Sequence, residues 1–147
     1  MRSPAHPPPR RLAALALLSE RQEVLLCRHR ENESYTLPWV AMAQEGGEDA
    51  QRAALDRLLT TLVTAPSDVG NALWLGRFAL PYPDGSRVDM LELHAARLEG
   101  ARLVAGPDAP RAWASLTAPA PAGRIDPTIA LHIMPVLAAL AGAATGE

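Results

Sequence analysis

Apolar positions follow two different spacings along this chain, and the changes of spacing outline its elements. Residues 12–18 are continuously apolar, which predicts a buried strand. A second strand is predicted over 24–30, and the polar turn at 19–22 joins the two into a hairpin. Over 48–63 the leucines recur at spacings of three and four, which predicts an amphipathic helix.

Two longer extended segments follow that helix, over 72–80 and 87–98. The Pro-Asp-Gly-Ser sequence at 83–86 is typical of a turn and predicts a second hairpin. Residues 111–116 are expected to form one more short strand.

The last element is predicted to be a helix that Asp126 and Pro127 begin, as N-cap and first-turn residues. Pro135 lies inside it and predicts a kink or a division into two short helices. With a further extended segment at 36–39, the order is β-β-β-α-β-β-β-α. This order predicts an α/β fold with a mixed sheet covered by helices on both sides.

Length, charge and composition exclude several classes of protein. A chain of 147 residues suits one domain, which we assign to residues 12–147, after a flexible proline-rich arm at 1–11. The formal charge of -2 excludes a basic surface for nucleic acid. The sequence contains no lysine, because all 14 of its Lys and Arg residues are arginine, so Schiff-base and P-loop lysine mechanisms are excluded. No apolar run reaches the roughly 18 residues of a membrane span, and we expect a cytoplasmic protein.

Three residues in apolar segments are expected to be buried in the core. Cys27 is the single cysteine, cannot form an internal disulfide and is typical of a small buried hydrophobe. Trp74 and Trp113 lie in predicted strands, so both indole rings are expected to pack inside. None of the histidines has a metal-ligand spacing, and none is assigned a catalytic role.

Four short motifs follow one another along the chain. Residues 25–30 have the form LL-x-R-x-R, and Leu37-Pro38 begins a loop. Residues 47–63 read GEDAQRAALDRLLTTLV, and residues 111–116 read RAWASL. In this order the motifs resemble those of the Nudix (MutT-like) hydrolase superfamily. The resemblance implies an α/β/α sandwich with the mixed sheet between helices, and self-association as a homodimer.

The resemblance also implies a reaction. Nudix hydrolases cleave a phosphoanhydride in a nucleoside diphosphate linked to another group, using Mg²⁺ or Mn²⁺ held by glutamates. Their signature is G-x5-E-x7-R-E-U-x-E-E-x-G-U, where U is a bulky aliphatic residue. Glu48 occupies the first glutamate position of this pattern. Arg57 stands where the next glutamate belongs, and Thr60 and Thr61 replace the glutamate pair, so the signature is degenerate.

The replaced positions share one helix face, because 57, 60 and 61 lie at i, i+3 and i+4. Hard divalent cations require oxygen ligands, preferably anionic ones. At ~4 Å and an effective dielectric constant of ~20, one pair of unit charges interacts by ~4 kcal/mol. Arg57 therefore repels a divalent ion where the family attracts one. We assign no cofactor and expect an inactive or strongly impaired homologue that binds a nucleotide or another phosphorylated small molecule.

The candidate binding residues each have two interpretations. Arg28 and Arg30 alternate to one strand face and either contact phosphates or are simply solvated. Tyr35 and Trp39 flank the signature loop and can stack on a base, whereas Trp39 can equally fill the space for substrate. Arg57 either contacts a substrate phosphate or pairs with a neighbouring carboxylate.

Two alternatives to the binding hypothesis stay open. The first is an active Mg²⁺- or Mn²⁺-dependent hydrolase with relocated ligands, drawn from Glu45, Glu48, Asp56 and Glu92. In it Glu48 is a metal ligand rather than a favourable charge at the helix start, and Glu92 is an auxiliary base. The second is a structural or interaction protein that contacts a partner through its arm or a sheet edge.

Overall fold

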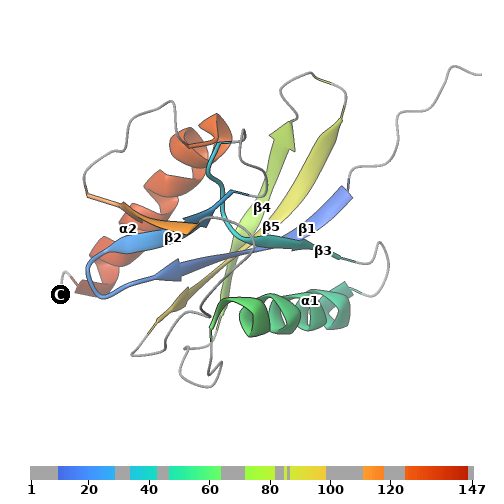
Figure 1. Cartoon of the computed structure of the whole chain (residues 1–147), viewed down its shortest axis with the longest axis horizontal. Coiled ribbons are helices and arrows are strands. Elements are labelled where there is room, and N and C mark those ends of the chain that lie inside the picture. Colours follow the sequence, from blue (N-terminus) through green and yellow to red (C-terminus); the bar gives the residue numbers. More distant parts are fainter. Residues whose placement is uncertain are drawn as a thin grey trace, which may run out of the picture.

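The computed structural model describes residues 10–28, 34–42, 47–63, 72–81, 85, 87–98, 111–117 and 125–145. Within these ranges a mixed sheet lies between two helices (Figure 1). The elements in chain order are β1 (Arg10–Leu18), β2 (Glu23–Cys27), β3 (Trp39–Ala41), α1 (Gly47–Leu62), β4 (Leu73–Pro81), β5 (Val88–Arg97), β6 (Arg111–Ser115), a π-helical segment (Ile129–Ile133) and α2 (Met134–Thr145). The predicted α/β class with helices on both faces is confirmed.

Strand β1 is the centre of the sheet, whose order is β4-β5-β1-β2-β6 with β3 also paired to β1. It runs parallel to β5 along its whole length, from the pair Arg10–Asp89 to the pair Leu18–Arg97. The two predicted hairpins are confirmed, because β1 is antiparallel to β2 and β4 is antiparallel to β5. Strand β4 therefore forms one edge of the sheet, and β6 forms the other.

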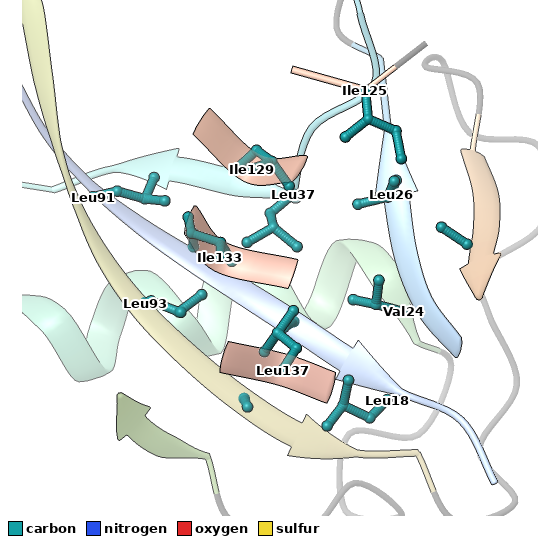
Figure 2. Packing of buried hydrophobic residues seen from close by; sticks show 14 of the residues in the cluster. Leu18, Val24, Leu26, Leu37, Leu91, Leu93, Ile125, Ile129, Ile133 and Leu137 are labelled. Atoms are coloured by element: carbon teal, nitrogen blue, oxygen red, sulfur yellow. The ribbon is translucent and has the colours of Figure 1, made fainter. Parts of the chain in front are cut away.

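The continuous apolar run of β1 is explained by its burial on both faces. Every residue from Leu12 to Leu18 is buried. The even-numbered side chains of β1 pack with the C-terminal helical segment, and the odd-numbered ones pack with α1. Figure 2 shows the first of these cores, in which Ile129, Ile133 and Leu137 meet side chains from the sheet.

Helix α1 forms where the leucine spacing predicts it. Its buried residues are Ala54, Leu55, Leu58 and Leu62, which make one stripe against β1. Glu48 and Asp49 lie in the first turn, where negative charge interacts favourably with the positive end of the helix dipole. The helix also contacts β3.

The terminal helix accommodates Pro135 by widening instead of breaking. The Asp126 carboxylate accepts hydrogen bonds from the backbone N–H groups of Thr128 (2.9 Å) and Ile129 (3.4 Å), which confirms the N-cap. The N–H of Met134 then bonds to the Ile129 carbonyl, five residues earlier. Proline cannot donate a hydrogen bond, and its ring collides with a carbonyl in a regular helix, so the wider turn relieves that conflict.

Several boundaries differ from those predicted. Strand β1 begins at Arg10 instead of Leu12, because Arg10 and Arg11 form ion pairs with acidic residues of β5. Strand β2 ends at Cys27, and Arg30 lies outside the described residues. The third strand is shifted to Trp39–Ala41. Residues 1–9, the rest of the predicted arm, also lie outside the described residues.

One expectation about the core is confirmed and another is wrong. Cys27 is buried and forms no disulfide, as predicted. Trp74 and Trp113 are instead 53% and 37% exposed, because they lie on the two edge strands of the sheet. Among the described residues, no helix is long and apolar enough to cross a membrane.

Candidate functional site

The face of α1 that corresponds to the Nudix signature carries one guanidinium and two hydroxyls. Arg57, Thr60 and Thr61 are all exposed on one continuous helix. The Thr60 hydroxyl donates to the Asp56 carbonyl (2.8 Å), and the Thr61 hydroxyl donates to the Leu58 carbonyl (2.7 Å). Both hydroxyls are therefore bonded back onto their own helix, and this donor set does not fit a divalent metal ion.

Arg57 contacts the backbone of strand β3. Its Nη2 donates to the backbone carbonyl of Ala41 in β3 at 3.3 Å. Among the described residues it has no carboxylate partner, so the expected pairing with Asp56 or Glu48 is not found there. The guanidinium is exposed and is oriented by one backbone oxygen.

The relocated metal ligands considered from the sequence lie in different surroundings. Glu48 and Asp56 are exposed on α1, Glu92 is buried in β5, and Glu45 lies outside the described residues. In the described part of the chain, no group of three or more His, Cys, Asp or Glu side chains is placed to hold a metal ion.

Glu92 is the centre of a buried polar cluster. It is 1% exposed, and both of its carboxylate oxygens have partners. Oε1 accepts a hydrogen bond from the Trp74 indole (3.0 Å), and Oε2 pairs with Arg77 (2.7 Å) and with Arg11 (3.8 Å). These partners compensate the buried negative charge. A carboxylate held in this way is a poor candidate for metal ligation or for proton transfer.

His94 lies next to Glu92 on the same face of β5 and connects the sheet to α1. Its Nε2 lies 2.7 Å from the Gln51 amide nitrogen, and its Nδ1 lies 3.1 Å from the Glu92 carbonyl. The amide nitrogen can only donate, so Nε2 accepts and the neutral ring donates through Nδ1. Burial lowers the pKa of His94 below its ordinary value of 6.5, against the opposing effects of the Ala14 and Glu92 backbone bonds and the Glu92 charge.

This lowered pKa predicts a loss of stability in acid. The unfolded chain takes up a proton on His94 as the pH falls through 6.5, whereas the folded protein resists it until a lower pH. The free energy of unfolding should therefore fall below that pH by up to about 1.4 kcal/mol per pH unit. Urea titrations at a series of pH values measure the slope. His94→Gln should flatten it, and His132→Gln, at an exposed position of the terminal helix, should not. Equal slopes in all three proteins would contradict this assignment.

The aromatic candidates beside the signature loop are each covered by an arginine of the chain itself. Arg10 lies over the Trp39 ring at 4.9 Å from its centroid, and Arg28 lies over the Tyr35 ring at 5.0 Å. Both rings are partly buried against the core on the α2 side of the sheet. The Nε of Arg28 is buried and has no hydrogen-bond partner among the described residues. Both interpretations of Trp39 stay open: the ring packs against the core, and stacking on a base requires a face that Arg10 leaves open.

This fold is similar to those of several solved structures. The dihydroneopterin triphosphate pyrophosphohydrolase of E. coli matches with a TM-score of 0.64 and 11% identity, over 88% of this chain and 95% of that chain. A C. elegans Ap4A hydrolase in a binary complex matches with a TM-score of 0.60 and 15% identity, over 94% and 99%. The NUDIX domain of Shewanella oneidensis NrtR, complexed with ADP ribose, matches with a TM-score of 0.53 and 14% identity, over 74% of each chain. The chain has the Nudix fold.

Sequence comparison adds nothing to this likeness, because no family model and no curated protein matches the chain. The similarity thus concerns the arrangement of the elements. Within this Nudix fold, α1 has the signature helix's place in the chain and its leucine stripe, while its exposed face has different chemistry.

Sequence reasoning named Glu92 but missed the residues that surround it. The sequence pattern predicts a core position for Trp74 and indicates no role for Arg11, Arg77 or His94. These side chains come from β1, β4 and β5, and they meet only through the pairing of those strands. One available signal was Gly76 inside an extended segment, since a glycine there often marks an irregularity of the sheet.

Proposed function

We propose that this Nudix-fold protein binds a phosphorylated small molecule, such as a nucleotide, and does not hydrolyse it by metal-assisted catalysis. The observation that carries the proposal is Arg57, an exposed guanidinium at the position of a metal-binding glutamate. Its contact with the Ala41 carbonyl orients the group without neutralising its charge.

The chemistry of this helix face suits a phosphate better than a metal ion. A guanidinium is a permanent cation whose planar set of N–H groups matches two phosphate oxygens at once. In metal-dependent relatives a divalent cation supplies this positive charge, whereas here Arg57 supplies it directly. Binding then requires no metal, and the water-activating function of a metal is lost.

Removal of the guanidinium should weaken binding markedly. Hydrogen bonds to charged groups contribute about 1.5–3 kcal/mol, so Arg57→Ala should lower affinity by roughly 10- to 100-fold. Isothermal titration with ADP-ribose, NAD and nucleoside triphosphates, without divalent metal, measures this effect. Arg52→Ala is the matched control, because Arg52 is exposed on another face of the same helix. Equal loss in the two variants would count against a site at Arg57.

Two further outcomes separate this proposal from its alternatives. Turnover near ~1 s⁻¹ on nucleoside diphosphate derivatives with Mg²⁺ or Mn²⁺ would establish an active hydrolase and refute the proposal. No heat with any of the compounds would favour a structural or interaction protein. Light scattering on the same samples tests the homodimer that the family resemblance implies.

A further inference from the structure

Strand β4 contains a β-bulge that brings Trp74 and Arg77 to the same face of the sheet. Residues three apart in a regular strand point to opposite faces. Here Trp74 is opposite His94, Gly76 is opposite Leu93, and Arg77 is opposite Glu92, so Leu75 is the extra residue. Bulges commonly redirect side chains in this way beside functional sites.

The sequence encodes this bulge through Gly76. Its backbone has a φ of +150°, a conformation that residues with a side chain rarely adopt. The bulge is therefore specified locally. As a result Leu75 and Phe78 pack toward the α2 side, while Trp74 and Arg77 reach Glu92 on the α1 side.

One buried carboxylate fixes both side chains while leaving them accessible. Trp74 and Arg77 each bind one oxygen of Glu92, yet Trp74 is 53% exposed and the Arg77 side chain is 58% exposed. An indole and a guanidinium are thus held next to each other on the surface. Groups fixed in advance lose less conformational entropy when a ligand binds.

The donors beside Glu92 suit an anion. Two guanidiniums, those of Arg77 (2.7 Å) and Arg11 (3.8 Å), share the single carboxylate of Glu92. Arg77 uses its Nε for the carboxylate, and within the described residues its guanidinium forms no other hydrogen bond. Its terminal nitrogens are therefore available as donors.

We propose that Trp74 and Arg77 form a ligand site for a planar aromatic ring that carries a phosphate. The ring stacks on the indole of Trp74, and the phosphate binds Arg77. A mononucleotide is the simplest compound with this chemistry. Different strands position the two candidate sites: the Arg57 guanidinium contacts β3, whereas Trp74 and Arg77 belong to β4, and β5 and β1 lie between these strands in the sheet. The site at Trp74 and Arg77 does not depend on the function proposed for Arg57.

Titration with AMP, followed through the indole N–H resonances in ¹H–¹⁵N NMR spectra, tests this site directly. The resonance of Trp74, identified by its loss in Trp74→Phe, should shift on addition of AMP. The resonances of Trp39 and Trp113 should not. Adenosine lacks the phosphate and ribose 5-phosphate lacks the ring, so each should bind about tenfold or more weakly than AMP.

Variants separate the two parts of the site. Trp74→Leu should lower AMP affinity about tenfold, and Arg77→Gln should reduce it to the affinity for adenosine. Trp113→Leu, an exposed tryptophan on the opposite edge strand, should change nothing. Arg57→Ala should also leave the Trp74 shift unchanged, which distinguishes this site from the one proposed above. Circular dichroism verifies that each variant is folded.

Two results would overturn the proposal. If AMP shifts the Trp74 resonance no more than the Trp113 resonance, the cluster only fastens β4 to β5. If Trp74→Leu instead lowers the mass of an oligomer in light scattering, Trp74 faces a second copy of the chain.

Discussion

Replacing Arg57, Thr60 and Thr61 together by glutamate is expected to create a divalent-metal site on α1. The three positions are exposed at i, i+3 and i+4, so three carboxylates fit there without disturbing the core. The Ala41 carbonyl lies 3.3 Å from the Arg57 guanidinium and offers a fourth oxygen ligand. The native side chains supply the geometry of this face but not the charge.

The effect should be visible as a metal-dependent gain in stability. Without metal the triple variant is destabilised by repulsion among its new carboxylates. Mn²⁺ at 100 times its dissociation constant should stabilise the fold by about 2.7 kcal/mol. Thermal unfolding with and without Mn²⁺ measures the change, and the native protein should show no comparable shift.

A matched control places similar charge on another face of the helix. Arg52→Glu with Ala53→Glu adds two carboxylates and, together with native Asp56, gives three neighbouring ones, all at exposed positions and with no carbonyl contact like that of Arg57. This variant should bind Mn²⁺ much more weakly. If both variants gain equally, charge density alone explains the result and the position of the signature face is irrelevant.

Glu92→Gln is expected to be the most destabilising single conservative substitution in the sheet. The amide keeps the size of the side chain but removes the charge that compensates Arg11 and Arg77. Breaking a buried ion pair costs several kcal/mol, and the exposure of Arg77 reduces this to about 2–4 kcal/mol here. Urea denaturation followed by circular dichroism measures the loss.

Glu48→Gln is the control for this substitution, because it removes an exposed carboxylate from the first turn of α1. Its effect should stay within about 0.5 kcal/mol. The double variant of Glu92→Gln with Arg77→Gln should be less destabilised than the sum of the two single variants, since each removes the other's partner. Additive losses would indicate that the two side chains do not depend on each other.

The sequence predicts the local elements well because their causes are local. The leucine stripe of α1, the Asp126 cap and the apolar run of β1 each depend on neighbouring residues. Pro135 shows the limit of such reasoning. A proline inside a helix predicts a steric clash and a lost hydrogen bond, but it does not predict how the backbone adjusts. The wider turn at 129–133 depends on the whole helix being held against the core.

The surroundings of Glu92 show what sequence patterns omit. Trp74 lies in an apolar segment that is indistinguishable in composition from a central strand, and only the strand order makes it an edge residue. Arg11 and Arg77 reach Glu92 through two strand registers and one bulge. These contacts join residues far apart in the chain, so no local pattern could specify them.

The central position of β1 also has a consequence for synthesis of the chain. Its partner β5 is distant in sequence: Arg10 and Asp89, which form an ion pair, are separated by 79 positions. At the usual 5–20 residues per second, roughly 4–16 s pass between the translation of the two strands. During that interval the apolar run of β1 has neither its parallel partner nor the terminal helix to cover it. The nascent chain is therefore most prone to aggregation at this strand. Shielding β1 during translation should improve the yield of folded protein.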